Sequence, residues 1–285
     1  MPAGAVVTRV LRTRAELRTA LRKAPRPVGL VPTMGWLHDG HRALMRRARV
    51  ADATTVVTIF VNPRQFDEPS DYTRYPRNED RDLAVCVDEA MDLVWAPPPE
   101  EVYPRGFDTA VSVGSLALPL EGAARPGHFD GVATVVAILF ALVGAEHAYF
   151  GQKDAQQVMV IRRMALDLAL PTEVIGCPTV REPDGLALSS RNVHLSPAER
   201  AAAPVLRRAL LEARACWESG ERSAEALRAA MREALAREPL ARVDYVSVAD
   251  PHTLTELDRL DDGALLSLAV RFGATRLIDN ELLLG

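Results

Sequence analysis

The feature that most constrains the fold is a strand–loop–helix–strand unit near the N-terminus. The apolar run 29–31 predicts a buried strand that ends at Pro32. The loop 33–41 follows, and then come a predicted helix over 42–50 and a β-branched strand over 54–61. Two strands joined through a helix pair in parallel, and parallel sheets bind ligands beyond the carboxyl ends of their strands. A binding site is therefore expected first in this loop.

The loop carries two histidines three residues apart. Gly35 and Gly40 let the backbone turn and approach a ligand closely. A helix that begins near Gly40 places His38 and His41 on one side of its first turn. Because helix N-termini attract anions, two imidazoles there indicate a phosphate site. A glycine-rich turn with two exposed histidines is the alternative, and the histidine pair by itself does not decide between the two.

Polar side chains also follow other predicted strands. Asn62 and Gln65 come after the second strand, and their amides both donate and accept, as a hydroxyl-bearing or zwitterionic ligand requires. A polar turn is the alternative for this pair. Lys153 and Asp154 follow a strand predicted over 147–150, where a lysine suits a phosphate. Asp154 suits either a ribose hydroxyl or the cap of the next helix.

The pattern as a whole predicts an α/β fold with two domains. Strands over 93–96 and 173–175 complete a Rossmann-like parallel sheet with helices on both faces. Near Glu182 the alternation of strand and helix gives way to helices followed by strands. Residues 1–181 are thus expected to form the catalytic domain, and 182–285 a smaller α+β C-terminal domain that closes over a nucleotide.

The segment after this boundary carries Ser189, Ser190 and Arg191. Two hydroxyls followed by a guanidinium suit phosphoryl oxygens, which arginine binds in bidentate fashion. Ser196 then caps a predicted long helix. The loop 121–129 has the composition of a mobile lid, which many surface loops share.

Composition excludes several functional classes. The chain has 285 residues, 48% of them apolar, and a net charge of −4, which gives no indication of a nucleic-acid partner. Arg42, Arg46 and Arg49 share one helix face, which is expected to be solvated.

Three scattered cysteines fit reduced thiols in a cytoplasmic protein. Residues 1–23 lack the apolar core of a secretory signal, and the apolar stretch 132–143 is shorter than the roughly 20 residues of a membrane span.

Three well-known motifs are missing from the strand–helix turns. The sequence has no Gly-x-Gly-x-x-Gly, no P-loop and no Gly-x-Ser-x-Gly, which argues against dinucleotide oxidoreductases, P-loop kinases and α/β-hydrolases. The polar groups that remain suit the adenylation of a carboxylate. In that reaction the carboxylate attacks the α-phosphorus of ATP, pyrophosphate leaves, and an amine then displaces AMP. The protein mainly aligns the reactants and neutralises phosphate charge.

The motif His38–His41 resembles the signature of the nucleotidylyltransferase superfamily, and the longer string 32–41 resembles the pantoate–β-alanine ligase (pantothenate synthetase) family. Further matching motifs cover nearly the whole chain: Phe60–Phe66, Tyr75–Arg77, Arg125–Phe129, Phe150–Gln157 and Leu186–Asn192. The resemblance implies ATP, Mg²⁺, (R)-pantoate and β-alanine as ligands. It implies pantothenate, AMP and pyrophosphate as products, formed through a pantoyl-adenylate. It also implies a cytoplasmic homodimer.

The resemblance assigns roles to individual residues. Gln65 and Gln157, with Asn62, would hold pantoate, and Gln65 would also approach β-alanine; metal ligands are not assigned. The ATP site would comprise Met34, Gly35, His38, Gly40, His41, Gly151, Gln152, Lys153, Asp154, Val180, Leu188, Ser189, Ser190 and Arg191. The catalytic residues among them would be His38, His41 (as proton donor), Lys153, Ser189, Ser190 and Arg191.

Four residues depart from the family pattern. Gln152 replaces a glutamate, Ala155 an aromatic residue, and Leu188 and Arg64 each replace a methionine. The glutamine removes a charge near Lys153. Arg64 places a cation near the pantoate pocket unless it points to solvent.

Two other functions fit part of the pattern. A cytidylyltransferase-like enzyme would share the histidine motif, but the neutral Asn62 and Gln65 argue against its phosphorylated acceptor. A non-catalytic nucleotide sensor or scaffold would be expected to have lost Lys153, His41 or Arg191, and all three are present.

Overall fold

The computed structural model describes residues 7–67 and 69–284 and divides into two compact units, each described by itself below. The first unit contains the described residues up to Gln152 together with Gln156–Pro178. The second contains Lys153–Ala155 and the described residues from Thr179 onward. The beginning of the stretch 1–23, in which no secretory signal is expected, lies outside the described residues. The functional roles expected for 1–181 and 182–285 stay predictions.

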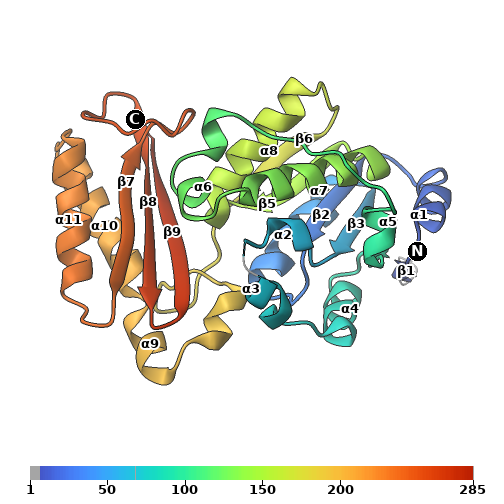
Figure 1. Ribbon diagram of the computed structural model, residues 1–285, viewed down its shortest axis with the longest axis horizontal. Coiled ribbons are helices and arrows are strands. Elements are labelled where there is room, and N and C mark those ends of the chain that lie inside the picture. Colours follow the sequence, from blue (N-terminus) through green and yellow to red (C-terminus); the bar gives the residue numbers. More distant parts are fainter. Residues whose placement is uncertain (1–6, 68, 285) are drawn as a thin grey trace. The chain divides into compact units, whose positions relative to one another are not determined.

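Six parallel strands form the sheet of the first unit, in the order β1-β4-β3-β2-β5-β6 (Figure 1). The predicted α/β class with a parallel sheet is confirmed. The edge strand β1 was not predicted, because three residues are too short to carry a pattern. The strands are β1 (Arg9–Leu11), β2 (Val28–Thr33), β3 (Thr54–Ile59), β4 (Leu93–Trp95), β5 (His147–Gly151) and β6 (Glu173–Cys177).

Helices cover both faces of this sheet. On one face, α2 (Asp39–Ala51) and α4 (Glu79–Asp88) pack over the buried side chains Val31, Val57 and Val94. On the other face, α7 (His128–Val143) contacts β2, and α1 (Arg14–Leu21) packs against α7. None of the helices in the described part of the chain is long and apolar enough to cross a membrane. The other helical segments are η1 (Pro63–Gln65), α3 (Pro69–Arg74), α5 (Pro99–Val102), η2 (Ser115–Ala117), α6 (Glu121–Ala124), η3 (Gln152–Asp154) and α8 (Ala155–Asp167).

Pro32 does not end its strand, contrary to the prediction. Strand β2 continues to Thr33, and Pro32 is paired with Thr58 of β3. The amide of Phe60 donates to the carbonyl of Thr33, so the backbone polar groups of residue 33 face β3. Because these groups alternate between the two sides along a strand, those of residue 32 face the β5 side. The pairing with β5 covers only residues 29–30. The proline therefore deprives no ladder of a donor.

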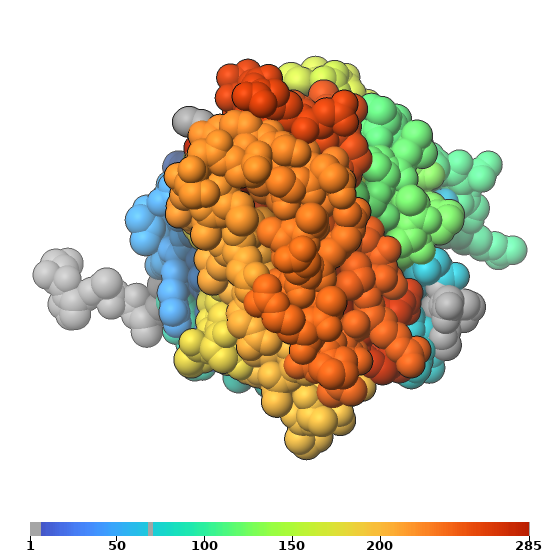
Figure 2. Space-filling model, turned by 90° about the vertical axis from the view of Figure 1, so that its left-hand side faces the viewer, coloured from blue at the N-terminus to red at the C-terminus, as the bar shows by residue number. Residues whose placement is uncertain are grey.

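The second unit is a three-stranded antiparallel sheet packed against helices. Its strands are β7 (Arg242–Ala249), β8 (Gly263–Phe272) and β9 (Thr275–Leu284), and its helical segments are η4 (Ser190–His194), α9 (Pro197–Ala202), α10 (Val205–Glu218) and α11 (Ala224–Ala236). Helices α10 and α11 cover one face of this sheet (Figure 1) and form the broad orange surface of Figure 2. The long helix predicted after Ser196 is in fact two. Its capping box with Glu199 starts α9, and Pro204 separates α9 from α10 because a proline cannot continue a helix interior.

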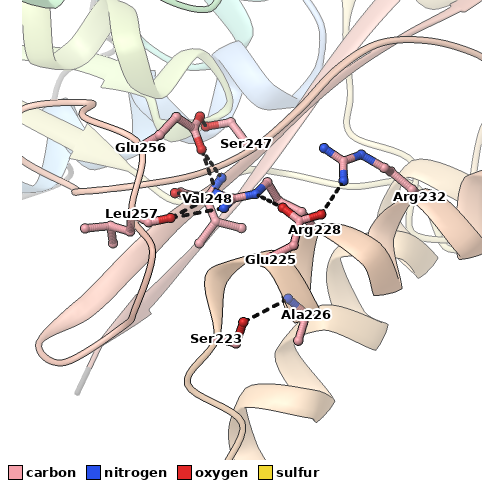
Figure 3. Close-up of polar contacts among 9 residues, drawn as sticks. All are labelled: Ser223, Glu225, Ala226, Arg228, Arg232, Ser247, Val248, Glu256 and Leu257. Atoms are coloured by element: carbon pink, nitrogen blue, oxygen red, sulfur yellow. Dashed lines mark hydrogen bonds and ion pairs between the residues drawn. The ribbon is translucent and has the colours of Figure 1, made fainter.

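Arg228 ties α11 to the sheet of the second unit (Figure 3). Its guanidinium pairs with Glu225 at 2.9 Å and with Glu256 at 2.8 Å, and donates to the carbonyl of Leu257 at 3.1 Å. Glu256 in turn accepts from the hydroxyl of Ser247 on β7. The charges in this cluster are matched by partners within the unit, so we assign it a structural role.

Candidate active site

The His-x-x-His motif forms the N-terminal cap of α2. His38 is the N-cap residue, and its Nδ1 accepts a hydrogen bond from the amide of Gly40 at 3.1 Å. The Nδ1 of His41 accepts from the amide of His38 at 3.3 Å, and the two rings lie 4.1 Å apart between centroids. The motif is therefore a capping box in which imidazoles take the places of the usual hydroxyl and carboxylate.

This cap fixes the tautomer of both imidazoles. A ring nitrogen that accepts a hydrogen bond carries no proton, so a neutral His38 or His41 has its proton on Nε2. Each ring is then an Nε2–H donor at the start of a helix, where the helix dipole also favours an anion. The arrangement suits phosphate oxygens, as the sequence predicts. The bonds to the backbone show in addition that both histidines hold the helix start.

Asn62 organises the polar segment after β3. It is 1% exposed, caps η1, and donates from Nδ2 to the side-chain oxygen of Gln65 at 2.9 Å and to the carbonyl of Gly131 at 3.1 Å. Its Oδ1 accepts from the hydroxyl of Tyr103 at 2.7 Å. The contacts of Asn62 thus orient the Gln65 amide, with its oxygen toward Asn62 and its NH₂ group on the opposite side. A direct substrate contact of Asn62 stays a prediction.

The backbone of Gln65 is held by two residues of the motif 125–129. Arg125 donates to its carbonyl from Nη2 at 3.0 Å, and the Nδ1 of His128 lies 2.7 Å from the same oxygen. Since a carbonyl oxygen only accepts, His128 carries its proton on Nδ1. Its Nε2 then faces Nη1 of Arg125 at 3.3 Å as an acceptor. The segment 121–129, whose composition suits a lid, forms α6 and the first turn of α7 and supports Gln65.

The other predicted substrate-side residues are less enclosed. Gln157 lies half-buried in the first turn of α8. Arg64 is exposed, and its guanidinium lies over the rings of Tyr103 at 5.6 Å and Phe107 at 5.2 Å. These cation–π contacts settle the Arg64 side chain on aromatic rings.

The second unit contains the remaining predicted phosphate contacts. Lys153 has a side chain only 13% exposed, with Nζ 3.4 Å from Oδ1 of Asp154. Its carbonyl accepts from the side chain of Asn280 on β9 at 2.8 Å, so the backbone of the lysine is anchored. Ser189 caps η4 by accepting from the amide of Arg191 at 3.2 Å. Their roles in ATP binding stay predictions.

The segment that leads to η4 is held by backbone bonds. The amide of Leu188 donates to the carbonyl of Val180 at 3.0 Å, and Arg181 is bridged to Ala187. Ser190 is half-buried at the start of η4. Within the second unit these bonds connect the predicted adenosine contact with the predicted phosphate contacts.

The arginine face of α2 is partly solvated, with Arg46 exposed, and it also carries ion pairs. Arg42 and Arg46 both contact Glu89, at 2.8 and 2.6 Å, and Arg49 contacts Asp92 at 3.1 Å. The guanidiniums of Arg46 and Arg42 hold the pKa of Glu89 below its usual value against the effect of burial. The sequence pattern on α2 could not reveal this, because the acids come from the end of α4 and the following turn.

Cys86 is not a candidate nucleophile. Burial, with a contribution from the charge of Asp82, raises the pKa of Cys86 to about 12. The thiol stays protonated at neutral pH, and only a thiolate is nucleophilic. We therefore assign this fully buried cysteine no catalytic role.

Three side chains that support the site carry no role that the sequence alone predicts. These are Asp82, which accepts from the backbone of the loop before the histidines, and Arg125 and His128, which hold Gln65. The motif 125–129 was visible in the sequence, but its contact with residue 65 depends on the fold. Nothing in the pattern of α4 distinguished Asp82 from its acidic neighbours.

The parallel sheet and the histidine pair that caps α2 after β2 define an α/β protein of the nucleotidylyltransferase type. The comparison with known proteins gives the family. The model of the family described as pantoate-beta-alanine ligase matches residues 6–282, and the chain belongs to that family.

Individual relatives agree with this assignment. The chain is 60% identical over 272 residues to the pantothenate synthetase of Roseiflexus sp. (strain RS-1). The matched region covers 95% of this chain and 98% of the relative. The crystal structure of pantothenate synthetase from Thermus thermophilus matches with a TM-score of 0.92 and 52% identity, over 96% of this chain and 98% of that one. A Francisella tularensis pantoate-beta-alanine ligase, described as complexed with beta-gamma ATP and beta-alanine, matches with a TM-score of 0.80 and 31% identity, over 97% and 98%. The activity is thus the ATP-dependent ligation of pantoate and β-alanine.

Proposed function

We propose that the chain activates (R)-pantoate as pantoyl-adenylate and then transfers the pantoyl group to β-alanine, releasing pyrophosphate in the first step and AMP in the second. The observation that carries this proposal is the imidazole capping box after β2, which presents Nε2–H donors at a helix start. Strand β3, which pairs with β2, leads directly to the held Gln65. The Francisella tularensis relative, complexed with beta-gamma ATP and beta-alanine, supports ATP and β-alanine as two of these ligands.

Each group has a distinct task in the adenylation step. His38 and His41 donate to phosphate oxygens, and His41 is the proton donor. Gln65 offers its NH₂ group to an oxygen of pantoate, since its own oxygen accepts from Asn62. Because little covalent work falls to the protein, alignment of the carboxylate with the α-phosphorus supplies much of the rate.

The second unit is assigned the charge on the phosphates. Lys153 is a point charge for phosphate oxygens, and Ser189, Ser190 and Arg191 add two hydroxyls and a bidentate guanidinium. The anchored backbone of Lys153 supports this role, because a preorganised donor loses little freedom when charge develops. Gln157 is the second pantoate contact, and Met34, Gly35, Gly40, Gly151, Gln152, Asp154, Val180 and Leu188 complete the ATP site.

Mg²⁺ is proposed to enter with ATP. Among the described residues no three side chains of the His, Cys, Asp or Glu type gather into a metal site. We therefore assign the ion no set of three protein ligands. Mg²⁺ typically keeps several waters and binds substrate phosphates, where it neutralises charge.

Cellular context is proposed on narrower grounds. Cys86 and Cys177 are free and buried, as expected in a reducing compartment such as the cytoplasm.

A homodimer follows from the family resemblance, and analytical ultracentrifugation at micromolar concentration tests it directly. A single species with the mass of one chain contradicts it.

Pyrophosphate exchange is the decisive assay of the mechanism. With pantoate present and β-alanine absent, labelled pyrophosphate should enter ATP, because the adenylate forms reversibly before the amine is needed. Addition of β-alanine should then yield AMP and pyrophosphate in equal amounts. Release of ADP and phosphate contradicts adenylation. Exchange with a phosphorylated acceptor in place of pantoate favours the cytidylyltransferase-like alternative.

A further inference from the structure

The loop before the capping box is held in an unusual backbone conformation. Gly35 and Trp36 have φ angles of 80° and 50°, which are left-handed values. A tryptophan in that region is strained and persists only where the surroundings hold it. The holding group is Asp82, which is 1% exposed: its Oδ2 accepts from the amide of Trp36 and its Oδ1 from the amide of Leu37, each at 2.8 Å.

Two neighbouring residues of α4 bind both backbone amides and a backbone carbonyl of this loop. While Asp82 accepts two amide hydrogens, the neighbouring Arg81 donates from Nη2 to the carbonyl of Leu37 at 2.8 Å and places its guanidinium 4.7 Å from the ring centre of Trp36. The fit to Asp82 is close at the glycine as well. A Cβ on Gly35 would lie 2.8 Å from Oδ2 of Asp82, a distance that real Cβ contacts essentially never show.

The series of backbone amides bound by side chains continues directly into the histidine motif. The amides of Trp36 and Leu37 go to Asp82, and the next amide, that of His38, goes to Nδ1 of His41. Three consecutive backbone donors are thus each bound by a side chain. Their order fixes the path by which the chain enters α2.

We propose that Asp82 is a positioning residue for the reaction: it holds the loop 34–37 in the conformation that receives ATP and sets the direction in which the histidine pair points. The inference rests on the proposed function, in which this loop and the histidines bind ATP. Asp82 acts through the backbone, with both oxygens engaged by the loop, and not by touching the nucleotide. Without this carboxylate the strained loop relaxes, and only a fraction of molecules is ready for ATP.

Asp82→Asn tests the proposal, because an amide keeps one acceptor and turns a donor toward the second backbone amide. Asp92→Asn is the matched control. Oδ2 of Asp92 accepts from the amide and the hydroxyl of Thr55, both at 2.8 Å, near the start of β3, at the opposite end of the strand from Gln65. Both substitutions should lower the unfolding temperature. A tenfold smaller binding-competent fraction raises the KM for ATP about tenfold in Asp82→Asn, while kcat at saturating ATP stays within about twofold.

The outcomes separate the inference from the proposed function. Wild-type protein without pyrophosphate exchange overturns the proposed function itself. If the wild type is active and neither Asp82→Asn nor Asp92→Asn changes the KM for ATP, the positioning role is overturned. A fall in kcat of Asp82→Asn with an unaltered KM for ATP does the same. Should Asp82→Asn not fold, Asp82→Glu keeps both acceptors one methylene further out, and a KM for ATP equal to that of the wild type then overturns the role.

Discussion

His41 caps α2 and is proposed to contact phosphate, and substitution should separate these two roles. His41→Ala removes the acceptor for the amide of His38, a bond of 3.3 Å. His41→Gln restores an acceptor, because glutamine is a usual residue at this position of a capping box. We expect the alanine variant to be both less stable and far less active, and the glutamine variant to regain the stability.

The two effects differ in size. Loss of a helix cap costs about 0.5–2 kcal/mol, and the long 3.3 Å bond places this one at the lower end. That loss lowers the unfolding temperature by a few degrees and leaves nearly all molecules folded, since domains are stable by roughly 5–15 kcal/mol. Loss of one preorganised donor to a transition state costs on the order of 10²–10³ in rate. Unfolding therefore cannot account for the expected loss of activity.

Thermal unfolding and pyrophosphate exchange, measured on the wild type, His41→Ala and His41→Gln, test this reasoning. Activity close to wild type in His41→Ala, with a lower unfolding temperature, would reduce His41 to a cap and refute the catalytic role. Substantial exchange in His41→Gln would identify hydrogen bonding to phosphate as the main contribution, because glutamine donates but does not transfer protons. Equal loss in both variants identifies proton donation.

Three further predictions address other parts of the site and fold. Lys153→Ala should slow adenylation by on the order of 10²–10³, and normal single-turnover kinetics would contradict a contact of the lysine with phosphate in the transition state. His128→Ala removes a donor to the Gln65 carbonyl and should raise the KM for pantoate about tenfold with less effect on the KM for ATP; equal changes in both contradict the selective support of Gln65. In the second unit, burial opposes ionisation of Glu281, but Arg207 and Arg214 hold the pKa of its carboxyl below the usual value. Since the folded-state pKa is the lower one, the stabilisation is present above about pH 4.3 and is lost as the pH falls through the folded value, so Glu281→Gln should destabilise at neutral pH and match the wild type in acid-titrated thermal unfolding.

The parallel sheet was predictable because its signals are local. The apolar run 29–31 and the β-branched run 54–61 each identify a buried strand within a few residues. The start of α2 was predictable for the same reason, since glycine, histidine and the helical pattern lie next to each other. By contrast, the continuation of β2 through Pro32 depends on how far β5 reaches along its neighbour. No local pattern contains that length.

The supporting side chains could not be predicted because they come from distant parts of the chain. Asp82 is 46 residues from Trp36, and His128 is 63 residues from Gln65. Each looks ordinary in its own segment: one acid among several on α4, and one histidine in a segment with the composition of a lid. What distinguishes them is a backbone group brought within 3 Å by the fold. Motifs reveal groups that meet the ligand, and the tertiary structure reveals the groups that hold those motifs.

The departure predicted at Gln152 illustrates why the supporting groups matter for interpreting substitutions. A Cβ on Gly176 of β6 would lie 3.0 Å from the side-chain oxygen of Gln152 and 3.2 Å from Nη2 of Arg162, so the amide and the guanidinium cover the same glycine. Arg162 also donates to the carbonyl of Val174. A glutamate at 152 would place its charge beside this arginine as well as near Lys153. The glutamine keeps an acceptor in that place and lacks only the charge.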